Sequence, residues 1–220
     1  MVYTKYISYF FYLAYNWNIG IARHVILQEI KGEKKYKIDT TGADELSGLQ
    51  KKGIDISHAT VYMPASYDLL EEVFEKLNLS RFGHMLDMGC GKGRALCVAA
   101  HYGVSQLTGV DFSKPLCQAA EKNLEITAAR VPGIHFKIWN HDAFYFDIPL
   151  DADCIFLFNP FDATIMSGVV KNIELSLKKN KRKITIIYFN PIEKSLFRGY
   201  KELFYLERKK YLAVSVLTRD

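Results

Sequence analysis

The sequence predicts an α/β protein with a mostly parallel sheet, and three observations support that prediction. Short apolar runs alternate with helix-like segments between residues 84 and 188, which is the pattern of parallel strands joined by crossover helices. Two further apolar runs, 203–207 and 212–218, flank the polar turn 208–211 as an antiparallel hairpin. A chain of 220 residues is long enough to bury the core of one such domain.

The first half of the sheet is expected around a glycine-rich turn. The first strand is expected at 84–87 and the first helix at 93–101, where small apolar residues follow the turn. The second strand is expected at 106–111. Its helix runs from 114 to 129 and has Pro115 in the first turn, where the missing N–H of proline costs no hydrogen bond.

The second half continues the alternation and ends in the hairpin. Strands are expected at 134–139, 154–158 and 183–188, and helices at 163–177 and 193–200. With the hairpin, this makes a mostly parallel sheet of seven strands. Because crossover connections cover both sides of a parallel sheet, we expect helices on both faces.

The composition is that of a soluble globular protein, with 49% apolar and 24% charged residues. The net charge of +5 permits an acidic partner but does not require one. The four cysteines lack the Cys-x-x-Cys spacing of a metal or redox site, so we expect no metal and small buried thiols in a reducing, cytoplasmic compartment. They are Cys90, Cys97, Cys117 and Cys154.

Residues 1–57 are expected to form a helical and loop extension, either a lid or a packing arm, ahead of a domain at 58–220. The aromatic run 6–17 is too short to span a bilayer and has no clear cleavage site. Its apolar spacing continues through Val25 and Ile26 as an amphipathic helix. Packing on the domain, a lid, a dimer contact and a membrane-surface anchor all stay open for this helix.

Residues 31–57 are polar and rich in turn residues, and are expected to connect that helix to the domain. Within them, Asp-Thr-Thr-Gly at 39–42 is either a local turn or helix cap, or a loop that closes over the substrate. Pro64 and Ser66 then stand where a further helix is expected to begin, and apolar residues at helical spacing continue to Leu77.

A glycine-rich turn follows the first expected strand. Residues 86–94 read Leu-Asp-Met-Gly-Cys-Gly-Lys-Gly-Arg, with glycine at every second position from Gly89. Such spacing lets the backbone turn sharply and presents a ligand to the free N–H groups of the next helix. One acid, Asp87, precedes the turn, and a second, Asp111, ends the next strand. A turn paired with a downstream carboxylate is how a Rossmann-like sheet holds a nucleotide.

The turn departs from two common nucleotide motifs. Arg94 stands where a dinucleotide fingerprint has its third glycine, and Gly93 follows Lys92 where a P-loop has serine or threonine. The pattern Asp-x-Gly-x-Gly-x-Gly from Asp87, with Gly-Val-Asp ending at Asp111, resembles motif I and its partner acid in class I S-adenosylmethionine-dependent methyltransferases. The resemblance covers residues 63 to 220 and implies a Rossmann-like sheet closed by the antiparallel hairpin.

The resemblance also implies S-adenosylmethionine as the cofactor and suggests its contacts. The turn would face the methionine part, and Asp87 would orient the turn or reach the ammonium directly or through water. Asp111 would accept from the ribose hydroxyls, and Phe112 would stack on adenine. Asp142 would accept from the adenine amino group, unless it is a helix N-cap. The implied cofactor set is Asp87, Gly89, Cys90, Gly91, Gly93, Asp111, Phe112, Asp142, Ala143 (whose N–H would bond the ring) and Asn159.

The strand at 154–158 is followed by Asn159, Pro160 and Phe161. This is similar to the Asn/Asp-Pro-Pro-aromatic motif of enzymes that methylate amide or amine nitrogen, but it lacks the second proline. The Asn159 amide oxygen and a backbone carbonyl would accept N–H bonds from a target amine, with Phe161 as a wall or stacking surface. The alternative is a proline-terminated strand with a buried aromatic.

A Tyr-x-Pro element at Tyr62 resembles the one that packs against the cofactor in Rossmann-type protein lysine methyltransferases, although a capped helix with an ordinary tyrosine explains it equally well. No residue stands out as an obligatory base; His58, Asp162 and Tyr62 are the candidates. The basic run 178–183 is typical of a solvated loop, but it leaves RNA contact open.

Three functions therefore stay open. The first is methyl transfer to a nucleophile, nitrogen favoured, of a protein side chain (lysine preferred) or a small molecule. The second is methylation of RNA. The third is a non-catalytic interaction module that uses the aromatic N-terminal helix as its contact.

Overall fold

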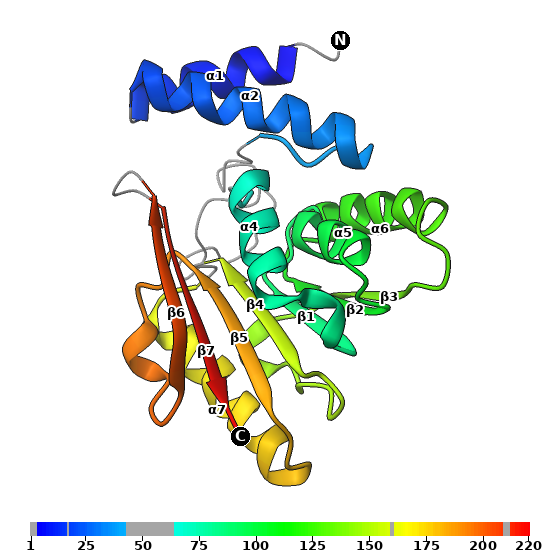
Figure 1. Ribbon diagram of the computed structural model, residues 1–220, viewed down its shortest axis with the longest axis vertical. Helices are drawn as coiled ribbons and strands as arrows, with labels where there is room; N and C mark the ends of the chain where they lie inside the picture. The colour runs from blue at the N-terminus through cyan, green and yellow to red at the C-terminus, as the bar shows by residue number, and fades with distance from the viewer. Residues whose placement is uncertain (1–3, 17, 43–63, 159–160, 209–211) are drawn as a thin grey trace.

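The computed structural model describes residues 4–16, 18–42, 64–158, 161–208 and 212–220 (Figure 1). Its centre is a seven-stranded sheet with the order β3-β2-β1-β4-β5-β7-β6. The first five strands are parallel, and β7 runs antiparallel between β5 and β6. The strands are β1 (His84–Met88), β2 (Gln106–Asp111), β3 (His135–Asn140), β4 (Cys154–Phe158), β5 (Ile184–Phe189), β6 (Lys201–Arg208) and β7 (Leu212–Arg219). The predicted fold class is confirmed.

Helices cover both faces of this sheet, and each face has its own apolar core. One core packs under α4 (Tyr67–Leu77), α5 (Arg94–His101) and α6 (Lys114–Ala128). The other packs under α7 (Ala163–Lys179), which lies on the opposite side of the sheet (Figure 1). Adjacent β1 residues Met85 and Leu86 enter different cores, as the alternation of side chains along a strand requires.

Short helical turns complete the domain. They are η1 (Leu79–Arg81), η2 (Ala143–Tyr145) and η3 (Lys194–Leu196). The helix expected at 193–200 is thus a single 3₁₀ turn, with a Gly199 φ of 80° that helices do not adopt. All four cysteines are buried free thiols, as expected.

The N-terminal segment forms two packed helices, α1 (Thr4–Asn16) and α2 (Ile19–Tyr36), at one end of the molecule (Figure 1). The connecting region expected from residue 31 is wrong over its first six residues, because α2 continues through them. Gly32 explains this: a Cβ there would lie 2.1 Å from the ring of Tyr67, so glycine lets α2 pack directly on α4. Tyr36 then stacks on the same ring, with centroids 5.7 Å apart.

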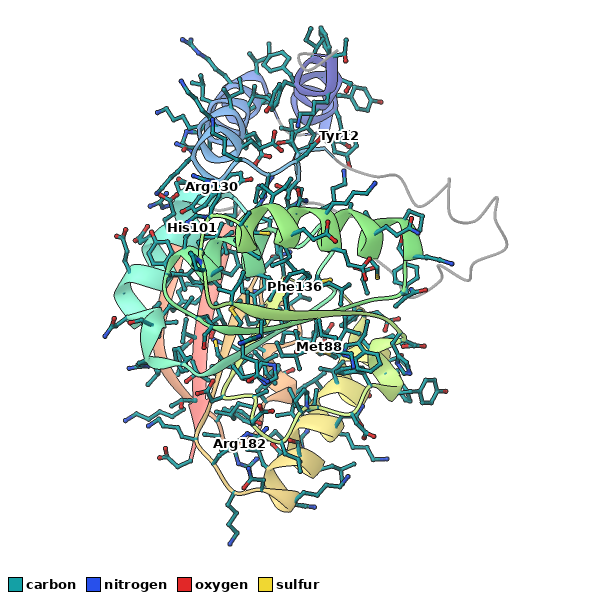
Figure 2. All side chains as sticks on the ribbon, turned by 90° about the vertical axis from the view of Figure 1, so that its right-hand side faces the viewer. Tyr12, Met88, His101, Arg130, Phe136 and Arg182 are labelled. Atoms are coloured by element: carbon teal, nitrogen blue, oxygen red, sulfur yellow. The ribbon has the colours of Figure 1, made fainter. Side chains whose placement is uncertain are left out.

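Other contacts fix α2 to the domain. Arg130, just beyond α6, donates to the carbonyl oxygen of Tyr36 at 2.6 Å and lies beneath the helix pair in Figure 2. The Tyr36 hydroxyl donates to Glu71 on α4 at 2.9 Å. Packing on the domain is therefore what the described part of the N-terminal segment does. Among the described residues, no helix is both long and apolar enough to cross a membrane.

Candidate active site

A tight turn joins β1 to α5, and three glycines make it possible. Gly89, Gly91 and Gly93 have φ values of 82°, 53° and 79°, in the left-handed region that favours glycine. The N–H groups of Gly89 and Cys90 donate to the carbonyl oxygen of Val110 on β2, at 2.8 and 3.0 Å. The turn is therefore fixed to the neighbouring strand by its own backbone.

Helix α6 closes the turn from the other side. A Cβ at Gly93 would lie 3.1 Å from the Cβ and 3.3 Å from the Cα of Ala120, so the two backbones approach closely. Burial, followed by the negative charge of Asp111, raises the pKa of the Cys90 thiol. Cys90 therefore contributes its backbone to the turn and keeps a neutral side chain.

Two buried carboxylates beside the turn differ in their hydrogen bonds. The two oxygens of Asp111, at the end of β2, accept the N–H groups of Gly91 and Ser113, both at 2.8 Å. Burial raises the pKa of Asp111, and these two N–H groups oppose that rise. Asp87 on β1 is 3% exposed, yet no residue in the described part of the chain donates a hydrogen bond to it.

Asp87 is consequently a buried acid with no hydrogen-bond donor among the described residues. Burial first, and the charge of Asp111 second, hold the pKa of Asp87 well above its usual range. A buried carboxylate without a donor is costly, and a cationic group placed beside it would remove that cost.

The carboxyl end of β3 supplies further polar groups. The Asn140 side-chain amide donates to the carbonyl oxygens of Asp111 and Phe112, at 3.1 and 2.8 Å, and so joins the ends of β2 and β3. Asp142 accepts the N–H of Phe144 at 2.8 Å as the N-cap of η2. The cap expected as the alternative role of Asp142 is therefore present, and it occupies one of the two carboxylate oxygens.

Arg94 anchors the N-terminal segment to the glycine turn. Its guanidinium forms a two-pronged ion pair with Glu29 of α2, with N–O distances of 2.7 and 2.5 Å. Nε donates to the Thr40 hydroxyl at 2.8 Å, and one Nη also donates to the Ala65 carbonyl oxygen at 2.8 Å. The guanidinium carbon lies 4.0 Å from the centre of the Tyr67 ring. Arg94, which stands where a dinucleotide motif has its third glycine, is thus a buried attachment point for α2.

A second acid of α2 holds the segment that follows the helix. One oxygen of Glu33 accepts the N–H groups of Thr40 and Thr41, at 2.8 and 2.7 Å. Its other oxygen accepts Lys5 and Tyr6 of α1, at 2.6 and 2.5 Å. Burial alone would raise the pKa of Glu33, but these hydrogen bonds outweigh it and hold that pKa below its usual value.

Asn123 of α6 links this segment to the turn. Its amide oxygen accepts the Asp39 N–H at 2.9 Å, and its amide nitrogen donates to the carbonyl oxygens of Asp39 and Lys92, at 3.1 and 2.9 Å. The stretch 39–42 was expected as a local turn or cap, or as a loop over the substrate. Its described hydrogen bonds instead run to residues distant in the sequence, among them Asn123, Arg94 and the two acids of α2, which offer buried partners that a local turn lacks.

The sequence comparison decides what this arrangement belongs to. Residues 85–180 match the model of a family described as a methyltransferase domain. Residues 85–180 therefore form a methyltransferase domain. The resemblance found in the sequence implies S-adenosylmethionine as the cofactor of such a domain. No curated protein sequence matches the chain.

Solved structures share the fold of this methyltransferase at low sequence identity. A putative methyltransferase, yhhF from Escherichia coli, matches with a TM-score of 0.56 and 14% identity, over 72% of this chain and 89% of its own. An RNA methyltransferase from Salinibacter ruber, solved with S-adenosyl-L-homocysteine, matches with a TM-score of 0.54 and 16% identity, over 71% and 93%. For "StiE O-MT residues 942-1257" the values are 0.51 and 16%, over 64% and 53%, so this chain spans about half of that segment.

The residues of the methyltransferase fit its cofactor. Asp87 is a buried acid that lacks a hydrogen-bond donor among the described residues, and the cofactor carries a cationic ammonium. Each Asp111 oxygen accepts one N–H, and a carboxylate oxygen has a second lone pair for a hydroxyl. The left-handed glycines keep side chains away from the turn, where a bulky ligand group must approach.

The acceptor side of the methyltransferase is only partly described. Asn159, Pro160, Tyr62 and His58 lie outside the described residues. Phe161 is buried in the core beneath α7, which agrees with the alternative of a buried aromatic after the strand. Asp162, a candidate base, is the N-cap of α7 and accepts the N–H of Ile165 at 3.0 Å.

Sequence reasoning missed Asn140, Asn123 and the pair of Glu29 with Arg94. A signal for the pair was present, because Glu29 and Glu33 are spaced four apart in an apolar helix pattern and therefore share one face. Their partners came from residues distant in sequence, and no local pattern identified them.

Proposed function

We propose that the methyltransferase acts on a nitrogen nucleophile and that protein lysine is its preferred acceptor. The register of the two central strands supports this. Met88 of β1 pairs with Leu157 of β4, so the glycine turn and the carboxyl end of β4, which Asn159 follows in the sequence, are at the same edge of the sheet. An asparagine at that point is suited to accept hydrogen bonds from an amine that approaches the methyl group.

The cofactor supplies a methyl group already activated on a sulfonium, so the protein's task is alignment, proximity and exclusion of water. We assign the ammonium to Asp87, the ribose hydroxyls to Asp111 and the adenine to Phe112, Asp142 and Ala143. The turn Gly89, Cys90, Gly91 and Gly93 would line the methionine part. Asn159 would lie between this donor site and the acceptor, with Pro160 fixing the exit of its strand and Tyr62 packing against the cofactor.

The acids described near the carboxyl ends of the strands already accept hydrogen bonds as helix caps, so neither stands out as a strong base. Asp142 caps η2, and Asp162 caps α7. An amine needs only to lose its proton in a dry pocket, since burial lowers the pKa of a lysine ammonium. A nitrogen acceptor is therefore the class that this chain's own residues serve best.

We further propose that the extension is a packing arm and not a detachable lid. Its residues 39–41 lie between α2 and the glycine turn, and Asn123 bonds to both the arm and Lys92. The expected division into 1–57 and 58–220 would then separate two parts that share one buried polar network.

RNA is the second candidate acceptor, and β3 offers the observation that favours it. Trp139 on this edge strand is 39% exposed, and the Lys137 ammonium lies 3.7 Å from its ring centre. An exposed aromatic beside a cation suits a stacked base and its phosphate. The basic run 178–183 is less suited, because it precedes β5. It is therefore at the amino ends of the parallel strands, whereas the glycine turn is at their carboxyl ends. Arg182 of this run donates to the carbonyl oxygens of Ala152 and Pro149 and lies at the far end of the molecule in Figure 2.

Transfer of a labelled methyl group to a fractionated cell lysate tests the proposal. We expect label in protein, resistant to ribonuclease and recovered as methylated lysine after acid hydrolysis. Asp111→Ala, which removes a donor contact, is the matched inactive control. Label that ribonuclease releases would move RNA to first place, and label released by mild base would show an oxygen acceptor and contradict a nitrogen acceptor.

Two variants on β3 sharpen the choice between acceptors. Trp139→Ala and Lys137→Gln should leave lysine methylation unchanged but lower any transfer to RNA several-fold. Lys178→Gln is the matched control for Lys137→Gln, because it also removes one exposed positive charge.

A further inference from the structure

The outer face of the helix pair α1–α2 exposes an unusual amount of apolar surface. On α1, Ile7, Phe11 and Tyr15 are spaced four apart and are 56%, 66% and 92% exposed. On α2, Leu27 and Ile30 are 49% and 40% exposed. Residues at these spacings share one side of a helix, so each helix presents an apolar stripe.

The two stripes meet at an open apolar groove between the helices. It has a volume of about 420 Å³. Its lining comes from both helices and consists of Tyr6, Ile7, Phe10, Phe11, Ile26 and Ile30. The side of α2 that faces the domain, with Glu29 and Tyr36, is fully buried, so this groove lies on a different side of the helix.

The same face is positively charged. Arg23 and Lys34 lie on the α2 side that carries Leu27 and Ile30, since 23, 27, 30 and 34 follow one another by three or four residues. Lys31 is exposed next to them, and none of these three cations pairs with a described residue. The two acids of α2 point away from this side, because Glu29 pairs with Arg94 and Glu33 binds Lys5 of α1 and the N–H of Thr40.

We propose that this face of α1–α2 docks on an anionic lipid surface. Aromatic and branched apolar side chains next to unpaired lysine and arginine are the composition of a helix that lies in the interface of a charged bilayer. Charge complementarity selects lipid over a second copy of this chain, because two such faces would bring like charges together. Docking would place the helix pair against the membrane and the sheet domain beyond it (Figure 1).

Vesicle sedimentation of the full chain tests the proposal. We expect the protein to sediment with vesicles of phosphatidylcholine and phosphatidylglycerol but not with phosphatidylcholine alone. Sodium chloride at about 1 M should release it, because salt screens the attraction between charges. Phe11→Ser should lower the vesicle partition coefficient by about tenfold, the effect of losing one buried aromatic side chain. The double variant Lys31→Gln and Lys34→Gln should lower it by a similar factor at low salt, roughly tenfold.

Matched controls come from the opposite end of the molecule. Leu150→Ser removes a similarly exposed apolar side chain, and the double variant Lys178→Gln and Lys179→Gln removes two exposed charges. Both controls should bind vesicles like the unaltered protein. All variants should bind S-adenosylmethionine normally, which shows that the fold is intact.

Three outcomes would overturn the proposal. The first is sedimentation that does not depend on phosphatidylglycerol, and the second is an equal loss of vesicle binding in the control variants and in the α1–α2 variants. The third is a protein that does not sediment but forms a dimer that Phe11→Ser dissociates, since the face would then be covered by a second copy of the chain.

Discussion

The proposed site for the methyl donor, around Asp87 and Asp111, and the junction between α2 and the glycine turn both bury charged side chains, but the charges are paired differently in the two regions. At the junction, Glu29 and Arg94 satisfy each other, and Glu33 accepts four hydrogen bonds. At the proposed cofactor site, Asp87 is equally buried and receives no hydrogen bond from a described residue. Charges that hold the fold together are paired within the chain, whereas the charge that we assign to the ligand is left for the ligand to pair.

Removing one member of the junction pair should have the largest effect. Arg94→Met leaves the Glu29 carboxylate buried without its cation, which we expect to lower the free energy of unfolding by about 3–5 kcal/mol. The double variant Glu29→Leu and Arg94→Met removes both charges and should recover much of that loss. Urea unfolding of the two proteins measures the difference; a double variant no better than the single one would show that the charge itself is not the cause.

Asp87→Asn should act in the opposite direction on stability. In the absence of S-adenosylmethionine, the neutral amide is not repelled by the charge of Asp111. We therefore expect the free energy of unfolding to rise by about 1 kcal/mol and the unfolding temperature to rise with it. Donor affinity should fall by roughly 10- to 100-fold, because a charge-assisted hydrogen bond is lost. Calorimetric titration and thermal unfolding check the two halves, and normal affinity in the variant would remove Asp87 from the ammonium site.

Gly93→Ala tests the turn that lies between the two regions. The φ of 79° and the 3.1 Å approach to Ala120 should together cost about 1–2 kcal/mol and weaken donor binding. Gly133→Ala is the matched control, since its φ is 88° but a Cβ there meets nothing within 4 Å. The control should lose stability through backbone strain alone and bind the donor normally. Equal binding of S-adenosylmethionine by both variants would show that the glycine turn is not part of the cofactor site.

The pH dependence should have opposite signs in the two regions. Burial and Asp111 raise the pKa of Asp87, so the folded protein holds that proton more tightly than the unfolded chain, and donor-free stability should fall as pH rises from about 4 toward that raised pKa. Glu33 has a lowered pKa, so its contribution is present above its unfolded pKa and lost as pH falls through the folded one.

Donor affinity should rise with pH as Asp87 ionises, and Asp87→Asn should flatten that profile. Glu33→Gln should flatten only the loss of stability on the acid side. These effects are the smallest of the series, and calorimetry across the pH range measures them. A donor affinity that does not vary with pH in the unaltered protein would contradict the ionisation of Asp87 on binding.

Local patterns were enough to predict the sheet and the turn. The strand ends fell within a few residues of their positions, because glycine and proline mark the boundaries in the chain itself. The structure also confirms the seven strands and the antiparallel hairpin. The acids at Asp87 and Asp111 were identified by their position at strand ends, and the structure places both beside the turn.

The junction was not predictable by the same reasoning. Arg94 was identified only as a departure from a dinucleotide motif, although it is the centre of a buried network. Its partner is 65 positions away, and a lone glutamate in a helix pattern says nothing about which distant cation it meets. Helix α2 also ran past its expected end, because packing of Gly32 on Tyr67 outweighs the weak helix propensity of glycine.

The long separation of Glu29 from Arg94 has a consequence for the order in which the protein assembles during synthesis. Glu29 leaves the ribosome well before Arg94 does, and at the observed pace of bacterial or eukaryotic elongation the interval is several seconds. Throughout that interval Glu29 lacks its partner cation, although Glu33 already has Lys5 of α1 to pair with, and the helix pair has no domain to pack on. Helix α2 is therefore made well before its buried partner, and the glycine turn receives the support of α2 only after its own strand and helix have emerged.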